Sequence, residues 1–135
     1  MVISEEYQVL VGGVAVGPLM ILDEPLSLWG GLDPVTGLII DQSHPQLGQS
    51  MTGRIAVMAH GRGSSSSSTI LAEAMRLRTA PAGFILGEPD AILVIGALVG
   101  ERLYERSCPI VCGPTPVGEA ESWKIDHNGV APTSA

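Results

Sequence analysis

The middle of the chain, residues 61–68, reads GRGSSSSS and combines two glycines, one arginine and five consecutive serines. The apolar run before it, residues 55–59, predicts a buried strand. The apolar residues after it recur at helical spacing and predict a helix over residues 65–78. The serines therefore lie at a strand–turn–helix junction. The first turn of a helix directs unpaired N–H groups and a partial positive charge outward, and such a turn suits an anion.

Ser64 follows Gly-x-Gly directly, where the backbone can turn sharply and approach a ligand closely. A serine hydroxyl is a weak nucleophile, and it becomes a useful base only where donors, cations or a helix N-terminus stabilise its alkoxide. Arg62, two residues earlier, is able to hold a carboxylate in a bidentate grip. The alternative interpretation is that Ser64 is only the helix N-cap and Arg62 a solvated surface charge.

Other candidate residues carry weaker signals. None of the three histidines has a partner at metal-ligand spacing. His44 either lines the site or is a loop residue, and His60 either binds substrate or is a hydrogen-bonded structural histidine. Cys108 and Cys112 are the only cysteines, and we interpret them as structural thiols that flank a strand, so no metal ligands are assigned. The chain contains neither a Walker A lysine nor a Gly-x-Ser-x-Gly elbow.

A tryptophan-glycine-glycine segment, residues 29–31, is followed by Asp33-Pro34 in a dense loop. Three interpretations of this loop stay open. Trp29 forms one wall of a pocket, or a docking surface for another chain, or a core tryptophan that caps the sheet.

Composition limits the class of protein. A chain of 135 residues predicts one domain over residues 1–135. A net charge of −7 with a single lysine argues against nucleic acid and against an anionic membrane surface, since both bind a basic face. The first residues show no signal peptide, and the longest apolar run, residues 91–99, is too short to cross a bilayer. Two thiols without a leader indicate a reducing cytoplasm.

The elements that must position the serines change character along the chain. The first part predicts strands over residues 7–16, broken at Gly12-Gly13, and over residues 19–22, then loops and an extended run at residues 38–41. From residue 54 onward strands alternate with helices, which favours parallel strands with helical crossovers. The expected strands cover residues 55–59, 83–86 and 109–111, and the expected helices cover residues 65–78 and 90–100. The fold class is α/β, with an all-β front half joined to an α/β back half.

The second predicted helix, residues 90–100, has Pro89 at its start and is apolar almost all round. It should be buried on most sides, in part against a partner. Residues 123–126 predict a last strand, and the tail from residue 128 is expected to be frayed.

Several motifs in one order resemble a known family. They are PLSLWGGLDP at residues 25–34, Gly37, IID at 39–41, HP at 44–45, GRGSS at 61–65, TAPA at 79–82, EP at 88–89 and GALV at 96–99. Together they resemble the small subunit of aconitase X, over about residues 9–111. The resemblance implies a swivelling β/β/α domain, similar to the fourth domain of aconitase and to the small subunit of isopropylmalate isomerase.

In those relatives a Gly-x-Gly-Ser-Ser-Arg motif lies at the same turn, and its first serine removes a proton from a carbon next to a carboxylate. By this resemblance Ser64 would be the catalytic base, and Ser65 would support it or bind substrate. This chain has Ser66 where aconitase has arginine, so Arg62 is the candidate substitute for the carboxylate grip. The expected substrate-binding residues are Ser65, Arg62, Gly63 and His44.

The resemblance also implies a cofactor and a partner. An iron–sulfur cluster would be bound by the cysteines of a large subunit, in a heterodimer or higher assembly that dehydrates a small hydroxy acid. Bacterial members look like cis-3-hydroxy-L-proline dehydratases and archaeal members like phosphomevalonate dehydratases. The serine run and the form of the Trp29 segment favour the first. Two other hypotheses stay open: a non-catalytic module that binds an anion, and an assembly subunit that docks through Trp29 and the second helix.

Overall fold

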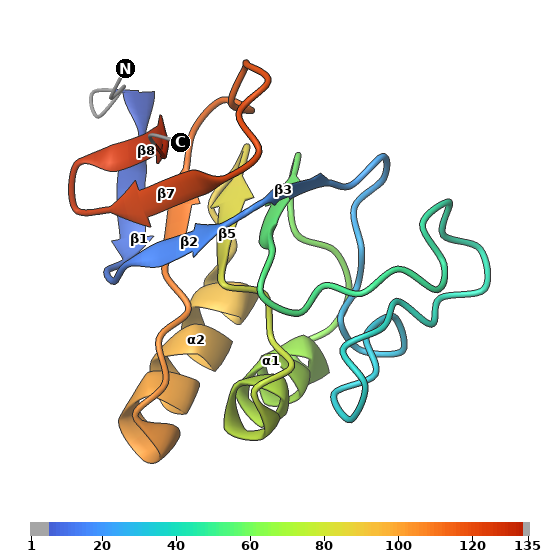
Figure 1. Ribbon diagram of the computed structural model, residues 1–135. Helices are drawn as coiled ribbons and strands as arrows, with labels where there is room; N and C mark the ends of the chain where they lie inside the picture. Colours follow the sequence, from blue (N-terminus) through green and yellow to red (C-terminus); the bar gives the residue numbers. More distant parts are fainter. Residues whose placement is uncertain (1–5, 134–135) are drawn as a thin grey trace.

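A computed structural model describes residues 6–133, and these contain two β-sheets and two helices (Figure 1). In chain order the elements are β1 (Gln8–Val11), β2 (Ala15–Gly17), β3 (Leu19–Ile21), β4 (Ile55–Met58), α1 (Ser66–Leu77), β5 (Gly83–Leu86), α2 (Ala91–Tyr104), β6 (Ile110–Cys112), β7 (Trp123–Asp126) and β8 (Gly129–Pro132). Neither helix in this part of the chain has the length and apolar character that crossing a membrane requires.

The five-stranded sheet has the strand order β1-β6-β5-β4-β3. Strands β3, β4, β5 and β6 are parallel, and β1 is antiparallel to β6 at the edge. The helices α1 and α2 follow β4 and β5 and pack together on one face of this sheet (Figure 1). A three-stranded antiparallel sheet, β2-β7-β8, covers the other face. The layers are therefore sheet, sheet and helices, as the α/β class and the β/β/α arrangement predicted.

The two-residue period of β4 divides its side chains between two cores. Ala56 and Met58 belong to the core under the helices, whereas Ile55 and Val57 belong to the core between the sheets. All four are buried, so the sequence of this strand is continuously apolar. A strand that is anchored on both faces gives the turn after it a rigid base.

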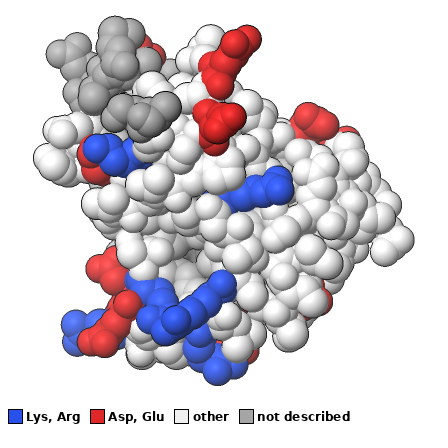
Figure 2. Space-filling model, in the orientation of Figure 1, with Lys and Arg blue, Asp and Glu red and all other residues white. Residues whose placement is uncertain are grey.

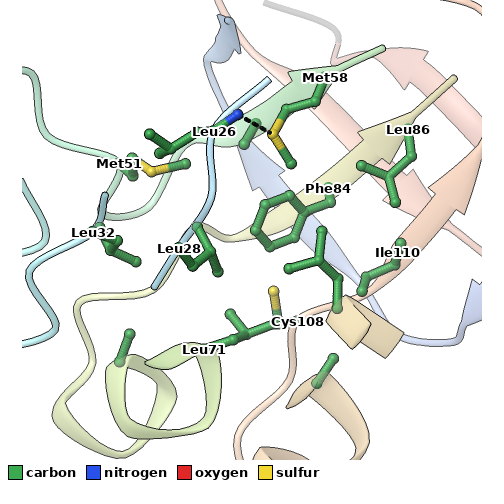
Figure 3. Close-up of a cluster of buried hydrophobic side chains, with 14 of the residues drawn as sticks. Leu26, Leu28, Leu32, Met51, Met58, Leu71, Phe84, Leu86, Cys108 and Ile110 are labelled. Carbon is green, nitrogen blue, oxygen red and sulfur yellow. Dashed lines mark hydrogen bonds between the residues drawn. The ribbon is translucent and has the colours of Figure 1, made fainter. Parts of the chain in front are cut away.

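The helix-side core also holds the long loop between β3 and β4 in place. Leu26, Leu28 and Leu32 from this loop are nearly inaccessible, and they pack in the same cluster as Phe84 and Leu71. Figure 3 shows Leu28 beside the ring of Phe84, with Leu71 of α1 on the same side. The apolar anchors explain how the intervening polar residues of this loop keep fixed positions beside the start of α1.

Strands β1, β2 and β3 are the regular elements of the front half, as predicted, and they enter both sheets: β1 and β3 join the five-stranded sheet and β2 joins the other. Two other predictions about the fold were wrong. The tail that was expected to be frayed instead forms β8. This strand is antiparallel to β7, with Gly129 opposite Asp126 at one end and Pro132 opposite Trp123 at the other. Residues 134 and 135 of that tail lie outside the described residues.

The second helix also differs from the prediction. Its N-cap is Asp90, whose side chain accepts hydrogen bonds from the N–H groups of Ile92 (2.8 Å) and Leu93 (3.1 Å). Pro89 therefore precedes the cap and is not in the first turn. The helix is buried along one side only, and its exposed apolar residues are Ile95, Leu98, Val99 and Leu103.

Candidate active site

The turn between β4 and α1, residues 59–65, lies at the carboxyl end of the parallel strands. In open α/β sheets this is the edge where ligands bind. Arg62, Gly63, Ser64 and Ser65 are all exposed there. The structure therefore brings four of the five predicted site residues together in one turn.

Two glycines allow this turn to fit between its neighbours. A Cβ on Gly61 would overlap the carboxylate of Asp90, the N-cap of α2. Gly63 has a φ of +101°, and a Cβ there would meet the side chain of Ser27. The turn is thus enclosed by α2 on one side and by the Ser27 loop on the other. Both contacts leave no room for a Cβ, so glycine is needed at each position. At Gly63 glycine is also favoured because it adopts a positive φ readily.

The serines of the run divide into two groups. Ser67 is buried, and its Oγ accepts a hydrogen bond from the N–H of Trp29 (3.1 Å). Ser68 Oγ donates to the carbonyl of Ile92 (2.6 Å) and ties α1 to α2. The hydroxyls of Ser67 and Ser68 therefore have structural roles. Among the described residues, no hydrogen bond occupies the Ser64 or Ser65 side chain, and the N-cap, Ser65, makes no side-chain capping bond.

The Ser67 bond carries a stability prediction. Ser67→Ala leaves the Trp29 N–H without its acceptor in a partly buried place, and this should lower the free energy of unfolding by about 1–3 kcal/mol. Ser66→Ala is the matched control, since it makes the same change one residue earlier on a half-buried side chain. Urea unfolding of both variants measures the difference. Equal stabilities would show that the Ser67 hydroxyl does not hold the loop.

Charges near the turn come from Arg62 and from the loop at Asp41. Hydrogen bonds from the Ser43 backbone and hydroxyl hold the pKa of Asp41 below its usual value, and the positive charge of Arg62 lowers it further. The Asp41 loop and Arg62 are therefore electrostatic neighbours. Arg62 takes part in no ion pair with the described residues.

The structure argues against the predicted substrate contact of His44. This side chain is 5% exposed. Its Nε2 lies 2.9 Å from the carbonyl of Glu24, and its Nδ1 accepts the N–H of Gln46 at 3.1 Å. Both ring nitrogens are occupied, so His44 is a structural residue of the loop. His60 is exposed, with Nδ1 2.8 Å from the carbonyl of Gly61.

Trp29 is 58% exposed and is not the core tryptophan that one interpretation of the sequence allowed. Its backbone N–H is fixed to α1 through the Ser67 hydroxyl, while its side chain is largely exposed. Ser27 and Asp90, which shape the turn, were not among the residues predicted from the sequence. Asp90 had a recognisable signal, because an aspartate directly before an apolar helical run is a favoured N-cap. Ser27 had none.

A family model described as the aconitase X swivel domain matches residues 5–130. The chain belongs to the aconitase X swivel domain family. The resemblance drawn from the motifs is therefore confirmed. Among solved structures, aconitase X of Thermococcus kodakaraensis in its holo-form superimposes with a TM-score of 0.80 at 29% identity, over 96% of this chain and 97% of that one. A solution NMR structure of a UPF0107 protein has a TM-score of 0.78 at 24% identity and supports the fold alone.

Curated relatives of this swivel domain are dehydratases or their subunits. A cis-3-hydroxy-L-proline dehydratase of Pseudomonas aeruginosa is 45% identical over 103 residues, which are 76% of this chain and 18% of that protein. The enzyme of the same name from Hypocrea jecorina is 39% identical, over 75% of this chain and 17% of that protein. A phosphomevalonate dehydratase small subunit of Methanopyrus kandleri is 41% identical, over 65% of this chain and 66% of that subunit. The swivel domain spans less than a fifth of the two hydroxyproline enzymes.

The donor groups of this swivel domain do not fit an iron–sulfur cluster. The described residues contain no group of three or more His, Cys, Asp or Glu side chains that could hold a metal ion. Burial raises the pKa of the Cys108 thiol to about 12, which keeps it protonated, whereas cluster ligands are thiolates. Cys112 is the other free cysteine, and it is partly exposed.

Proposed function

We propose that this swivel domain is the small subunit of an aconitase X-type hydro-lyase, and that it supplies Ser64 as the base that dehydrates cis-3-hydroxy-L-proline. The observation that carries the proposal is the division of the serine run. Ser67 and Ser68 are engaged in the fold, while the Ser64 hydroxyl is exposed and unoccupied at the start of α1. The 45% identity to a dehydratase of that name supports the choice of substrate.

The surroundings of Ser64 suit proton abstraction. Free N–H groups and the partial positive charge at the start of α1 stabilise the alkoxide of Ser64 relative to that of a solvent-exposed serine elsewhere. Arg62 is close enough along the turn to hold the substrate carboxylate, which places the neighbouring carbon near Ser64 Oγ. Ser65 donates a further hydrogen bond to the substrate. As the base takes the proton, the C–H electron pair forms the double bond and the hydroxyl group leaves as hydroxide, which takes up a proton from a donor on the partner's side of the site to become water.

An exposed turn is only half of such a site. We assign the other half to a large partner subunit, which would close over the turn and exclude water. The name "small subunit" of the archaeal relatives supports a partner of this kind. We also assign any iron–sulfur cluster to that partner, since the donor set of this chain does not fit one. The free thiols of Cys108 and Cys112 fit a reducing cytoplasm.

Phosphomevalonate is the second candidate substrate. A phosphomevalonate dehydratase small subunit is 41% identical to this chain, which supports that substrate. The higher identity to the hydroxyproline enzyme points the other way. The two observations lead to different substrates, and an assay decides between them.

The deciding experiment combines the swivel domain with its large partner and measures water loss from both compounds. We expect turnover of cis-3-hydroxy-L-proline and none of phosphomevalonate. Turnover of phosphomevalonate alone would overturn the choice of substrate and leave the role of Ser64 standing. A complex that forms but dehydrates neither compound would favour a binding or assembly role.

A further inference from the structure

A second cavity lies at the opposite edge of the parallel sheet from Ser64. It has a volume of about 220 Å³ and is bordered by Gly53 and Ala82, which precede β4 and β5. Arg78, the C-cap of α1, and Arg106, which follows α2, line it from the helix side. The Ser64 turn follows the other end of β4, so this cavity is separate from the candidate active site.

Arg106 carries an unsatisfied donor. Its Nε is buried and has no hydrogen-bond partner among the described residues. Buried polar groups are nearly always hydrogen-bonded, because an unpaired donor costs its full desolvation free energy. The ion pairs in this part of the chain are Arg76–Glu73 and Lys124–Asp126, so neither Arg78 nor Arg106 is neutralised by a carboxylate.

The cavity is basic although the protein is acidic. The chain has 14 Asp and Glu residues, yet none of them lines this cavity, which holds two arginines. Four of the seven Lys and Arg residues lie at or just after the C-terminal ends of α1 and α2, namely Arg76, Arg78, Arg102 and Arg106. Figure 2 shows the basic side chains gathered at the lower left of this face, next to a hollow.

The helix macrodipole explains only part of this cluster. Arg76 and Arg102 lie in the last turns of the two helices, where a cation offsets the partial negative charge of the free carbonyls. Arg78 instead occupies a left-handed position with a φ of +64°, where glycine is favoured. An arginine at that position brings a second guanidinium group to the cavity wall.

We propose that this cavity binds a phosphate group. Two guanidinium groups without a carboxylate balance a phosphate dianion better than a single carboxylate, and the planar guanidinium fork matches phosphate oxygens. The volume is below the range of about 300–1,000 Å³ that is typical of drug-sized ligands, so it suits a phosphate or the phosphate end of a small molecule. The terminal N–H groups of Arg78 and Arg106 would donate to the phosphate oxygens.

The test uses the full chain and two probes, inorganic phosphate and glycerol 3-phosphate, at constant ionic strength. Titrations followed by NMR should move the amide signals of Gly53 and Ala82 and the Nε–H signal of Arg106. Arg78→Gln or Arg106→Gln should each weaken binding about tenfold or more. Arg102→Gln, which removes a charge outside the cavity lining, should leave the affinity unchanged. Tighter binding of glycerol 3-phosphate than of phosphate would identify a phosphorylated small molecule as the ligand.

Arg78 is exposed, so Arg78→Gln keeps the test valid even where Arg106→Gln destabilises the fold. Equal weakening by all three variants would show diffuse charge attraction and overturn the proposal. So would an absence of signal changes with either probe, or acetate binding as tightly as phosphate.

Discussion

Replacing Ser64 with alanine should lower kcat of the assembled enzyme by about 10²–10⁴-fold, which is the usual contribution of a general base. The Ser64 hydroxyl makes no hydrogen bond to the described residues. Its loss therefore removes a proton acceptor without breaking a structural contact. We expect the thermal stability of the chain and its assembly with the large partner to stay unchanged. Steady-state kinetics of the reconstituted complex give kcat, and thermal unfolding of the isolated chain serves as the check on structure.

Ser66→Ala is the matched control, because it removes a hydroxyl from the same run without touching the proposed base. Its kcat should stay near that of the unmodified enzyme. Should Ser64→Ala retain near-normal turnover, the base must be another group and the chain becomes a binding subunit. Should both variants lose activity together, the serine run acts as a whole in positioning the turn.

Gly63→Ala should also be severe, with a loss of about 10²-fold in kcat/KM, because a displacement of about 1 Å in a reacting group has an effect of that size. Gly63 has a φ of +101°, and an added Cβ would lie 2.6 Å from the Cβ of Ser27. Either the turn or the Ser27 loop must move. Because Ser64 is the next residue, a shift of the turn moves the proposed base directly.

Two further variants separate contact from backbone strain. Gly30 also has a positive φ (+79°), but a Cβ there meets nothing within 4 Å. Gly30→Ala should therefore introduce backbone strain without a steric contact and leave the enzymatic activity unchanged. Adding Ser27→Gly to Gly63→Ala removes the contacting side chain and should restore part of the lost rate. Equal losses from Gly30→Ala and Gly63→Ala would mean that the contact with Ser27 does not position the turn.

Much of the α/β core could be predicted from local pattern alone. The strands over residues 83–86 and 123–126 match β5 and β7, and the helix predicted over residues 65–78 is α1, at Ser66–Leu77. These segments are short apolar runs or amphipathic stretches bounded by glycine and proline, so local sequence determines them. The same pattern located the Ser64 turn, because a turn between a buried strand and a helix has few possible positions.

Pairing between distant segments was less predictable. The chain breaks at Gly12-Gly13 as expected, but no local signal shows that β1 and β2 enter different sheets. The β7–β8 hairpin turns at His127-Asn128, and Gly129 after it pairs with Asp126. The Asn128-Gly129 dipeptide is a turn signal in the sequence, but the prediction was a frayed tail. The burial of His44 depends on the carbonyl of Glu24, 20 residues away, and only the folded loop brings them together.

The roles within the serine run were equally hidden. Five identical side chains give no basis for ranking them, and the capping role expected of a serine is absent at Ser65. The ranking comes from partners elsewhere in the fold, the N–H of Trp29 for Ser67 and the carbonyl of Ile92 for Ser68. Ser64, Ser65 and Ser66 make no side-chain hydrogen bond to the described residues, and the first two of them are the pair that the family resemblance had indicated.

The most direct test is a crystal structure of the Ser64→Ala variant, assembled with its large partner and soaked with the hydroxy acid that it cannot turn over. If Ser64 is the base, an Oγ rebuilt on residue 64 should lie about 3–3.5 Å from the carbon that loses its proton. A substrate bound with that carbon far from residue 64, and with a side chain of the partner in reach instead, would contradict the account.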